Sequence, residues 1–407
     1  MKTLIFMMMC MAMLLYLLVI LRRKPSQNLD SVEAIIPAFN EAPCLEASLT
    51  SLLNNRYIKR VICVNDGSTD DTAKVLEMMA ARWGERLLVI HQKNTGKGGA
   101  LMNGVKHATA EHVFLSDADT RIPSDSDGLG FLLAEIERGA DAVGGIPSSD
   151  LRVAGVLPHI RATVKLPMIA MKRTLQQVLG GAPFIISGAC GMFRTEVLLK
   201  HGFSDRTKVE DLDLTWTLVQ RGYRIRQCNR CIVYPQECNT LREEWKRWRR
   251  WIVGYAVCIR LHRKILLTRF GLFSILPMFF VVAFGVLIYL TAWGMSLLES
   301  DIAGVFQTIF PLLWVTIVCS IGFLSALLHR SLSLVVLAPL SVLYVLLSYA
   351  IWMIHGVPAF FTGREPTRDK PTRYTHMVES THPVVDKQTT AAASKSESAT
   401  RSEISRC

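Results

Sequence analysis

Long uncharged stretches of apolar residues constrain the fold of this chain more than any other feature of its sequence. Three of them follow one another late in the chain, at 272–295, 304–328 and 332–354. Each is longer than the roughly 20 residues that an α-helix needs to cross the hydrocarbon core of a bilayer. A fourth apolar stretch, at 4–21, is followed at once by the basic residues 22–24. The sequence therefore predicts a membrane protein.

The charges beside these stretches indicate how the chain crosses the membrane. A secretory signal peptide carries its basic residues before the apolar run, whereas here they follow it, so 4–21 is predicted to be an uncleaved anchor. Positive charge stays on the cytoplasmic side, which places the next segment in the cytoplasm. The link at 299–301 is acidic, 329–330 is basic, and the tail after Phe361 is also basic. The two links predict that the C-terminus lies outside the cell, whereas the basic tail predicts that it lies in the cytoplasm. The side of the membrane on which the C-terminus lies is therefore left open.

Composition narrows the classes of function. Hydrophobic residues make up 50% of the chain and the formal net charge is +12. Much of the positive charge flanks apolar stretches, which favours contact with lipid headgroups over nucleic-acid binding. The ten cysteines show no disulfide-like spacing and are predicted to be reduced thiols. Cys228, Cys231 and Cys238 lack the fourth ligand of a structural zinc site.

Between the membrane stretches, the chain alternates short apolar runs with helical patterns. Strands are predicted at 32–37, 61–64, 87–91 and 112–116, and helices at 40–54, 70–83 and 98–108. This alternation is typical of a largely parallel α/β sheet, whose ligands bind at the carboxyl ends of the strands. The predicted divisions are a membrane anchor, an α/β domain, a basic aromatic segment, membrane helices and a polar disordered tail, at 1–24, 30–240, 241–268, 269–356 and 357–407.

Polar residues gather where the predicted strands end. Asp117 and Asp119 follow the fourth strand, and this spacing either forms a solvated turn or binds a divalent cation such as Mg²⁺ or Mn²⁺. Asp66 begins an Asp-Gly turn, where its carboxylate can also accept hydrogen bonds from a nucleobase. Lys97 lies in a glycine-rich segment at the start of a predicted helix, a position that suits phosphate.

Two later segments also carry chemistry. Glu210 and Asp211 precede a helical run at 214–220. They either cap that helix or provide a general base that takes a proton from an acceptor hydroxyl. At 243–251, tryptophan recurs every three residues among basic side chains. This pattern predicts an amphipathic helix at the membrane surface, which can also close over a diphosphate and a sugar ring.

Taken in order, these positions resemble the processive inverting family-2 glycosyltransferases, such as the synthases of poly-N-acetylglucosamine, chitin oligosaccharides, hyaluronan and cellulose. The resemblance covers roughly 30–260 and follows the order of seven motifs: Pro37 to Glu41, Asp66-Gly-Ser68, Asn94 to Lys97, Asp117-x-Asp119, Gly188 to Arg194, Glu210-Asp211 and Arg250-Trp251. It implies a GT-A fold with a mostly parallel sheet, plus one N-terminal and about three C-terminal transmembrane helices. It also implies a hexosyltransferase that uses a UDP-sugar with Mg²⁺ or Mn²⁺.

The resemblance assigns a role to each matching residue. The nucleotide-sugar would be bound by Pro37, Asn40, Glu41, Asp66, Lys97, Asp117, Arg250 and Trp251. The catalytic pair would be Asp211, as the base, with Glu210. The metal ligands would be Asp119 and Asp117, and the acceptor would contact Gly188 and Trp251.

One residue departs from the family pattern Gln-x-x-Arg-Trp, because Arg247 stands at the glutamine position. That glutamine is tied to acceptor or nucleotide handling. The main expectation is a β-linked polysaccharide, with N-acetylglucosamine as the first sugar to test. Transfer of one sugar to a lipid carrier and a non-catalytic scaffold or receptor stay as alternatives. The expected partners are a UDP-sugar, a polysaccharide or lipid-linked acceptor, membrane lipids and export or accessory subunits, but no nucleic acid. The expected location is a bacterial cell membrane, with the catalytic domain in the cytoplasm.

Overall fold

The structure is a computed structural model that describes residues 24–123, 126–152, 155–277, 294, 301–365 and 373. The predicted anchor at 4–21, most of the predicted span at 272–295 and most of the predicted tail at 357–407 lie outside these residues. By its contacts the chain divides into Met1–Tyr374 and Thr375–Cys407. All the described residues belong to the first unit.

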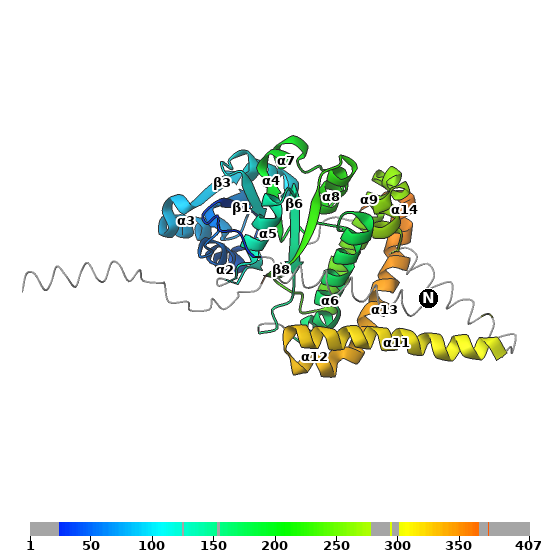
Figure 1. The fold of residues 1–407 in the computed structure, drawn as a ribbon. Coiled ribbons are helices and arrows are strands. Elements are labelled where there is room, and N and C mark those ends of the chain that lie inside the picture. Colours follow the sequence, from blue (N-terminus) through cyan, green and yellow to red (C-terminus); the bar gives the residue numbers. More distant parts are fainter. Residues whose placement is uncertain are drawn as a thin grey trace, which may run out of the picture. The chain divides into compact units, whose positions relative to one another are not determined.

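A sheet of eight strands forms the centre of the described part of the chain (Figure 1). The strands are β1 (Val32–Ala38), β2 (Ile58–Asp66), β3 (Leu87–Gln92), β4 (His112–Leu115), β5 (Thr120–Arg121), β6 (Ala142–Pro147), β7 (Gly191–Arg194) and β8 (Ile225–Pro235). Their order across the sheet is β3-β2-β1-β4-β7-β6-β8-β5. The first four strands confirm the predicted ones, with small differences at their ends.

The sheet is mixed, whereas the sequence predicted a largely parallel one. β1 pairs in parallel with β2 and β4, and β2 pairs in parallel with β3. β7, however, runs antiparallel to both of its neighbours, β4 and β6, and β5 runs antiparallel to β8. The strand–helix rhythm that predicts parallel pairing ends after β4. The direction of the later strands is therefore not contained in that rhythm.

Helices cover both faces of this sheet. They are α2 (Ala42–Leu53), α3 (Thr72–Trp83), α4 (Gly96–Lys106), α5 (Gly128–Glu137), α6 (Val156–Gly180), α7 (Thr195–His201), α8 (Glu210–Gln220) and α9 (Leu241–Leu261). Successive side chains of a strand point to opposite faces. In β1, Ala34 and Ile36 accordingly join the core under α2, α3 and α5, whereas Ile35 joins the core under α4, α7 and α8. Both faces are buried, which explains why every residue of β1 except Glu33 is apolar.

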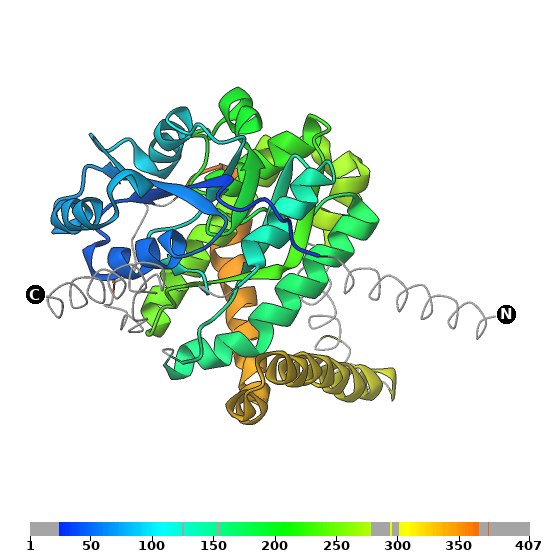
Figure 2. The same ribbon diagram turned by 60° about the vertical axis from the view of Figure 1, so that its left-hand side comes forward.

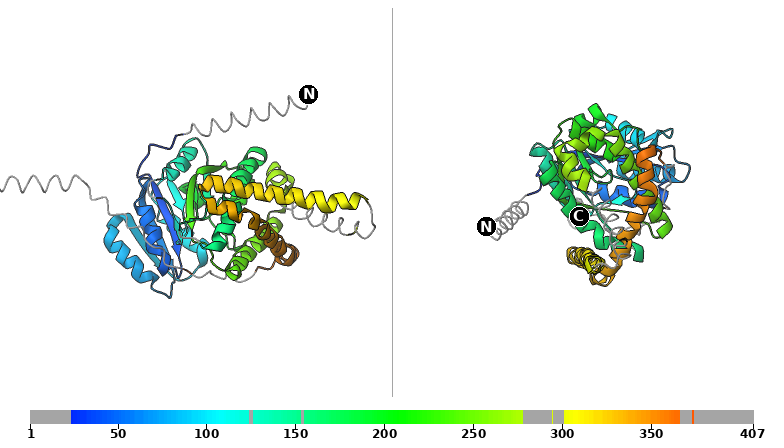
Figure 3. Two further views of the ribbon diagram at one scale, coloured as in Figure 1. Left: turned by 90° about the horizontal axis from the view of Figure 1, so that it is seen from below. Right: turned by 90° about the vertical axis from the view of Figure 1, so that its right-hand side faces the viewer.

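In the described residues after the α/β domain, the α-helices are α11 (Asp301–His329), α12 (Leu332–Leu337), α13 (Ser341–Ile351) and α14 (Val357–Thr362). α11 and α12 cross one end of α6, and α13 and α14 pack along α9 (Figures 1 and 2). Seen from below, α11 extends away from the sheet (Figure 3). Among the described residues, one helical run, Leu332–Thr362, is long and apolar enough to cross a membrane. The predicted span at 332–354 lies inside this run, and the one at 304–328 lies inside α11.

Candidate active site

The carboxyl ends of β1, β2 and β4 lie next to one another and carry three of the predicted motifs. In the register of β1 and β2, Ala38 lies opposite Asn65. Because β1, β2 and β4 are parallel, the residues at or just after their ends share one edge of the sheet. This edge carries Glu41, Asp66 and Asp119. The sequence prediction that these motifs meet at the strand ends is therefore confirmed.

The carboxylate of Asp66 fixes the segment that leads into α4. It accepts hydrogen bonds from the backbone N–H groups of Thr95, at 2.8 Å, and Gly96, at 2.9 Å. The next residue, Gly67, has φ +72°, and a Cβ there would come within 2.9 Å of a backbone nitrogen of the neighbouring loop. Asp66 and Gly67 thus form the predicted turn. Through the hydrogen bonds of Asp66, this turn fixes the first residues of α4, where Lys97 lies.

The loop after β1 is tied to the same edge. The backbone N–H of Asn40 donates to Ser68 Oγ at 3.0 Å, and Asn40 Oδ1 accepts from the Thr69 N–H at 2.8 Å. Asn40 has φ +52°, in the left-handed region that asparagine tolerates better than most residues. Pro37, by contrast, lies inside β1 opposite Val64, and not in the loop.

Lys97 joins segments that are far apart in the sequence. Its Nζ lies 2.6 Å from Asp117 Oδ1 and 3.3 Å from Glu210 Oε1. A Cβ on Gly188 would come within 3.1 Å of the same Nζ and 3.6 Å of Asp211 Oδ2. Four other predicted site residues therefore lie around the ammonium group of Lys97, and a side chain at Gly188 would intrude on it.

Asp211 lies in the first turn of α8, and its Oδ2 accepts a hydrogen bond from the Gly188 N–H at 3.0 Å. Burial raises its pKa, as do the charges of Glu210 and Asp117, whereas Lys97 and the Gly188 N–H lower it. The residue that caps α8 is Val209, so neither acid is the cap residue. A carboxylate with a raised pKa is better suited than a free aspartate to take up a proton near neutral pH.

Asp119 and Glu41 share a partner that the sequence reasoning missed. The guanidinium group of Arg373 contacts Asp119 Oδ2, and its Nη2 donates to Glu41 Oε1 at 2.9 Å. Burial raises the pKa of Asp119, the charges of Asp117 and Glu41 add to this, and Arg373 opposes it. The partners lie 254 and 332 residues apart in the chain. No local pattern could have indicated this contact.

The residues around Asp119 can provide part of a site for a hard divalent cation. Carboxylate oxygens are the ligands that Mg²⁺ and Mn²⁺ prefer, and here Asp119 and Glu41 already converge on one positive group. Within the described residues, however, no group of three or more His, Cys, Asp or Glu residues is arranged to hold a metal ion. A metal bound by Asp119 and Asp117 would need further oxygen ligands, such as those of a diphosphate.

α9 packs closely against the start of α8. A Cβ on Gly254 would come within 2.6 Å of the Val209 side chain, so the close contact depends on glycine. Trp251 precedes Gly254 by one helical turn and is half-buried. Burial and the charge of the predicted base raise the pKa of the Tyr255 hydroxyl, and Arg250 opposes this. α9 therefore carries Arg250 and Trp251 beside the helix that carries the predicted base.

Comparison with known proteins identifies the class to which this fold and site belong. The family described as Glycosyl transferase family 2 matches residues 33–202. The chain is 68% identical over 379 residues to "Uncharacterized glycosyltransferase YaiP" of Escherichia coli (strain K12), which covers 93% of this chain and 95% of that protein. The chain therefore belongs to glycosyltransferase family 2 and is an enzyme of that family, with a mixed α/β sheet of the GT-A type.

More distant similarities extend over part of the chain. It is 30% identical over 243 residues to "Poly-beta-1,6-N-acetyl-D-glucosamine synthase" of Staphylococcus aureus (strain COL), over 58% of this chain and 57% of that protein. The chain thus matches little more than half the length of this relative. A solved structure of a mannosyltransferase from Pyrobaculum calidifontis, in complex with GDP-Man and Mn²⁺, is 20% identical with a TM-score of 0.47. It covers 72% of this chain and 90% of the solved one.

Proposed function

We propose that this enzyme transfers a sugar from a UDP-sugar to a growing β-linked polysaccharide at a bacterial membrane, with N-acetylglucosamine as the first sugar to test. The arrangement around Lys97 carries the proposal. One ammonium group there lies between Asp117 and Glu210 and next to Gly188, which itself borders Asp211. The name of the 30% identical relative, a poly-N-acetylglucosamine synthase, supports the choice of sugar and of a polymeric product.

In this proposal, the leaving group is stabilised by one cation at the edge of the sheet and one on α9. Lys97 and Arg250 would offset the negative charge that develops on UDP as its bond to the sugar breaks. The nucleotide would lie along the edge formed by Asn40, Glu41 and Asp66. A Mg²⁺ or Mn²⁺ ion held by Asp119 and Asp117 would supply further positive charge at the diphosphate.

The transfer itself would be a single displacement at the anomeric carbon. Asp211, with Glu210 beside it, takes the proton of an acceptor hydroxyl, and the hydroxyl oxygen forms the new bond to that carbon. The bond from the same carbon to the UDP oxygen breaks on the opposite side, so an α-linked donor gives a β-linked product. Gly188 leaves room for the acceptor because it has no side chain, and Trp251 would stack on an acceptor sugar.

The membrane arrangement is part of the proposal. The α/β domain at 30–240 would lie in the cytoplasm and 241–268 at the membrane surface. The segments at 1–24 and 269–356 would lie in the bilayer. The apolar helical run Leu332–Thr362 and the similarity to a polysaccharide synthase support this arrangement. The acceptor would then reach the site beside the lipid.

The alternative product is a single sugar on a lipid carrier. The departure from the family pattern at Arg247 keeps this alternative, because the position is tied to handling of the acceptor. The non-catalytic scaffold is not retained, because the chain belongs to an enzyme family and carries every expected carboxylate at its strand ends and helix starts.

Release of UDP from a panel of UDP-sugars tests the proposal with purified, detergent-solubilised protein. We expect one donor, UDP-N-acetylglucosamine first, to give UDP and a ladder of long products on a gel. Chelation with EDTA should lower the rate by about tenfold or more, because the diphosphate loses its counter-charge, and Mn²⁺ should restore it. A product of one sugar on lipid would support the alternative, and release of UDP by none of the donors would contradict the proposal.

A further inference from the structure

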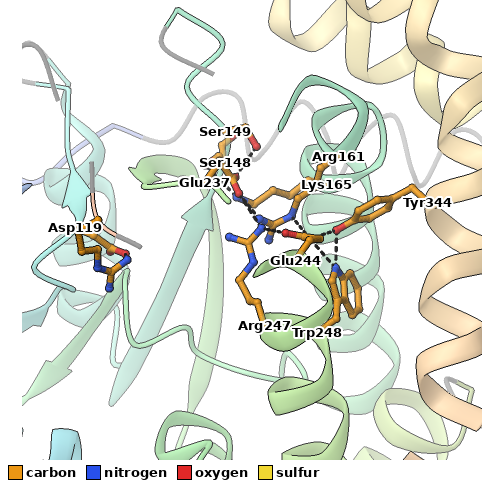
Figure 4. A network of polar contacts seen from close by, with 11 residues as sticks. Asp119, Ser148, Ser149, Arg161, Lys165, Glu237, Glu244, Arg247, Trp248 and Tyr344 are labelled. Carbon is orange, nitrogen blue, oxygen red and sulfur yellow. Dashed lines mark hydrogen bonds and ion pairs between the residues drawn. The ribbon is translucent and has the colours of Figure 1, made fainter. Parts of the chain in front are cut away.

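A cluster of charged side chains is buried between α6, the end of β8 and the start of α9 (Figure 4). We call it the charge cluster, and it consists of Arg161, Lys165, Glu237, Glu244 and Arg247. None of the five side chains is more than 10% exposed. Burying charges is costly unless each is paired, so such a cluster calls for an explanation beyond packing.

The pairing within the charge cluster is dense. Glu237 contacts Arg161, Lys165 and, at 3.2 Å, Arg247. Glu244 contacts Arg247, and its Oε1 lies 3.6 Å from Arg161 Nε. The two arginines are thus each held by both carboxylates. Such double pairing fixes the position of a planar guanidinium group more tightly than one contact would.

Both arginines also contact the same aromatic ring. The guanidinium carbons of Arg161 and Arg247 each lie over the Trp251 ring, 5.5 Å from its centre. This distance is within the range in which a cation is attracted to an aromatic face. Arg247 precedes Trp251 by one turn of α9, whereas Arg161 comes from α6. The ring is therefore held from two separate helices.

The charge cluster is in turn anchored to α13. Tyr344 Oη donates to Glu244 Oε1 at 2.6 Å, and Trp248 Nε1 donates to the same oxygen at 2.8 Å (Figure 4). The rings of Trp248 and Trp251 meet edge to face with 5.8 Å between their centres. The surroundings of Trp251 are thus connected to a helix beyond the α/β domain.

We propose that Arg161 and Arg247 are positioning residues that hold the Trp251 ring where the acceptor sugar binds, with Glu237 and Glu244 fixing both guanidinium groups. The proposal rests on the proposed function of Trp251 in acceptor binding. It gives Arg247, which departs from the family pattern, a defined task. It also makes α6, which no sequence motif marks, a part of the acceptor site.

The position of the ring can be tested without any activity. We would label the solubilised protein with 5-fluorotryptophan and assign the Trp251 ¹⁹F resonance from its absence in Trp251→Phe. Arg161→Lys and Arg247→Lys keep the charge of the cluster but remove the planar group, so they should still fold. Arg242→Lys is the matched control, because Arg242 is exposed at the start of the same helix. We expect both cluster variants, but not the control, to shift or broaden the Trp251 resonance.

The link to the acceptor is tested by kinetics on the same three variants. With UDP-N-acetylglucosamine as donor and a β-linked N-acetylglucosamine pentasaccharide as acceptor, the cluster variants should raise the acceptor KM by about threefold or more. The donor KM should stay within about twofold, because the donor is bound at the edge of the sheet. An unchanged Trp251 resonance in both cluster variants would overturn the positioning role of Arg161 and Arg247, and with it their role in acceptor binding. A shifted resonance with an unchanged acceptor KM overturns the role in acceptor binding. Absence of transfer by the unmodified enzyme counts against the proposed function, whereas the NMR result still decides the positioning.

Discussion

Asp211→Asn should lower the rate of sugar transfer by about 10²–10⁴-fold, the usual contribution of a general base. An amide cannot take the proton of the acceptor hydroxyl, but its oxygen can still accept the hydrogen bond that the Gly188 N–H now donates to Asp211. The affinity for UDP should therefore change little. The measurement is the transfer rate of the purified variant, together with UDP binding by calorimetry on the same preparation.

Glu77→Gln is a matched control for this variant, because Glu77 is exposed on α3, away from the site. The control variant should transfer sugar at the normal rate. The pH profile gives an independent check. Burial, Glu210 and Asp117 raise the pKa of Asp211, so the loss of kcat on acidification should begin at a higher pH than the ordinary value of about 3.9 would give. Transfer by Asp211→Asn at the normal rate would remove Asp211 from the mechanism.

Glu237→Gln should be the most destabilising single change in the charge cluster, by about 3–5 kcal/mol. Burial opposes ionisation, but Arg161, Lys165 and Arg247 hold the pKa of Glu237 far below its usual range. Without this carboxylate, three buried cations face Glu244 alone. Glu237 is ionised throughout the neutral range, so the pH dependence of the loss comes from Lys165, whose pKa is about 7. The loss should therefore be larger at pH 6, where Lys165 is charged, than at pH 8. The measurement is the urea midpoint of the solubilised protein.

Lys165→Met is the matched comparison, because it removes one of the three cations and leaves two cations with two carboxylates. Burial lowers the pKa of Lys165 to about 7. Its charged form is thus disfavoured in the folded state, and this cost is full below pH 7 and fades as the pH rises toward 10. The free energy of unfolding of Lys165→Met, relative to that of the unmodified protein, should accordingly be more favourable near pH 6 than near pH 9. Equal destabilisation by both variants would contradict the account of the charge cluster.

The parts of the fold that the sequence predicts correctly are those determined by local patterns. In the first half of the domain, apolar runs alternate with helical spacing, and β1 to β4 and the helices between them lie where those patterns place them. The strand-end motifs also meet as expected, because parallel strands bring their carboxyl ends to one edge. Lys97 and Asp117 needed only this topology to come together.

The parts that the sequence does not predict depend on contacts between distant segments. β7 joins the sheet in the antiparallel direction after the 25-residue helix α6, which interrupts the rhythm of the earlier strands. Arg161 and Glu237 are 76 residues apart, and neither belongs to a motif. The sequence did contain one signal for the charge cluster. Arg161 and Lys165 are four residues apart on the same side of α6, and two buried basic residues need acidic partners nearby.

The hydrogen bonds of Glu244 with Tyr344 and Trp248 have a consequence for how this enzyme can vary between relatives. Apolar side chains of α9, including Ile252 and Ala256, pack against Ile351 and Trp352 beside these hydrogen bonds. A chain cut off after α9 would expose that apolar surface and leave Glu244 without its hydroxyl donor. The α/β domain and the helices after it are therefore not separable modules. An exchange of segments between two related enzymes should give a working protein only when α9 and the later helices that pack against it come from the same parent.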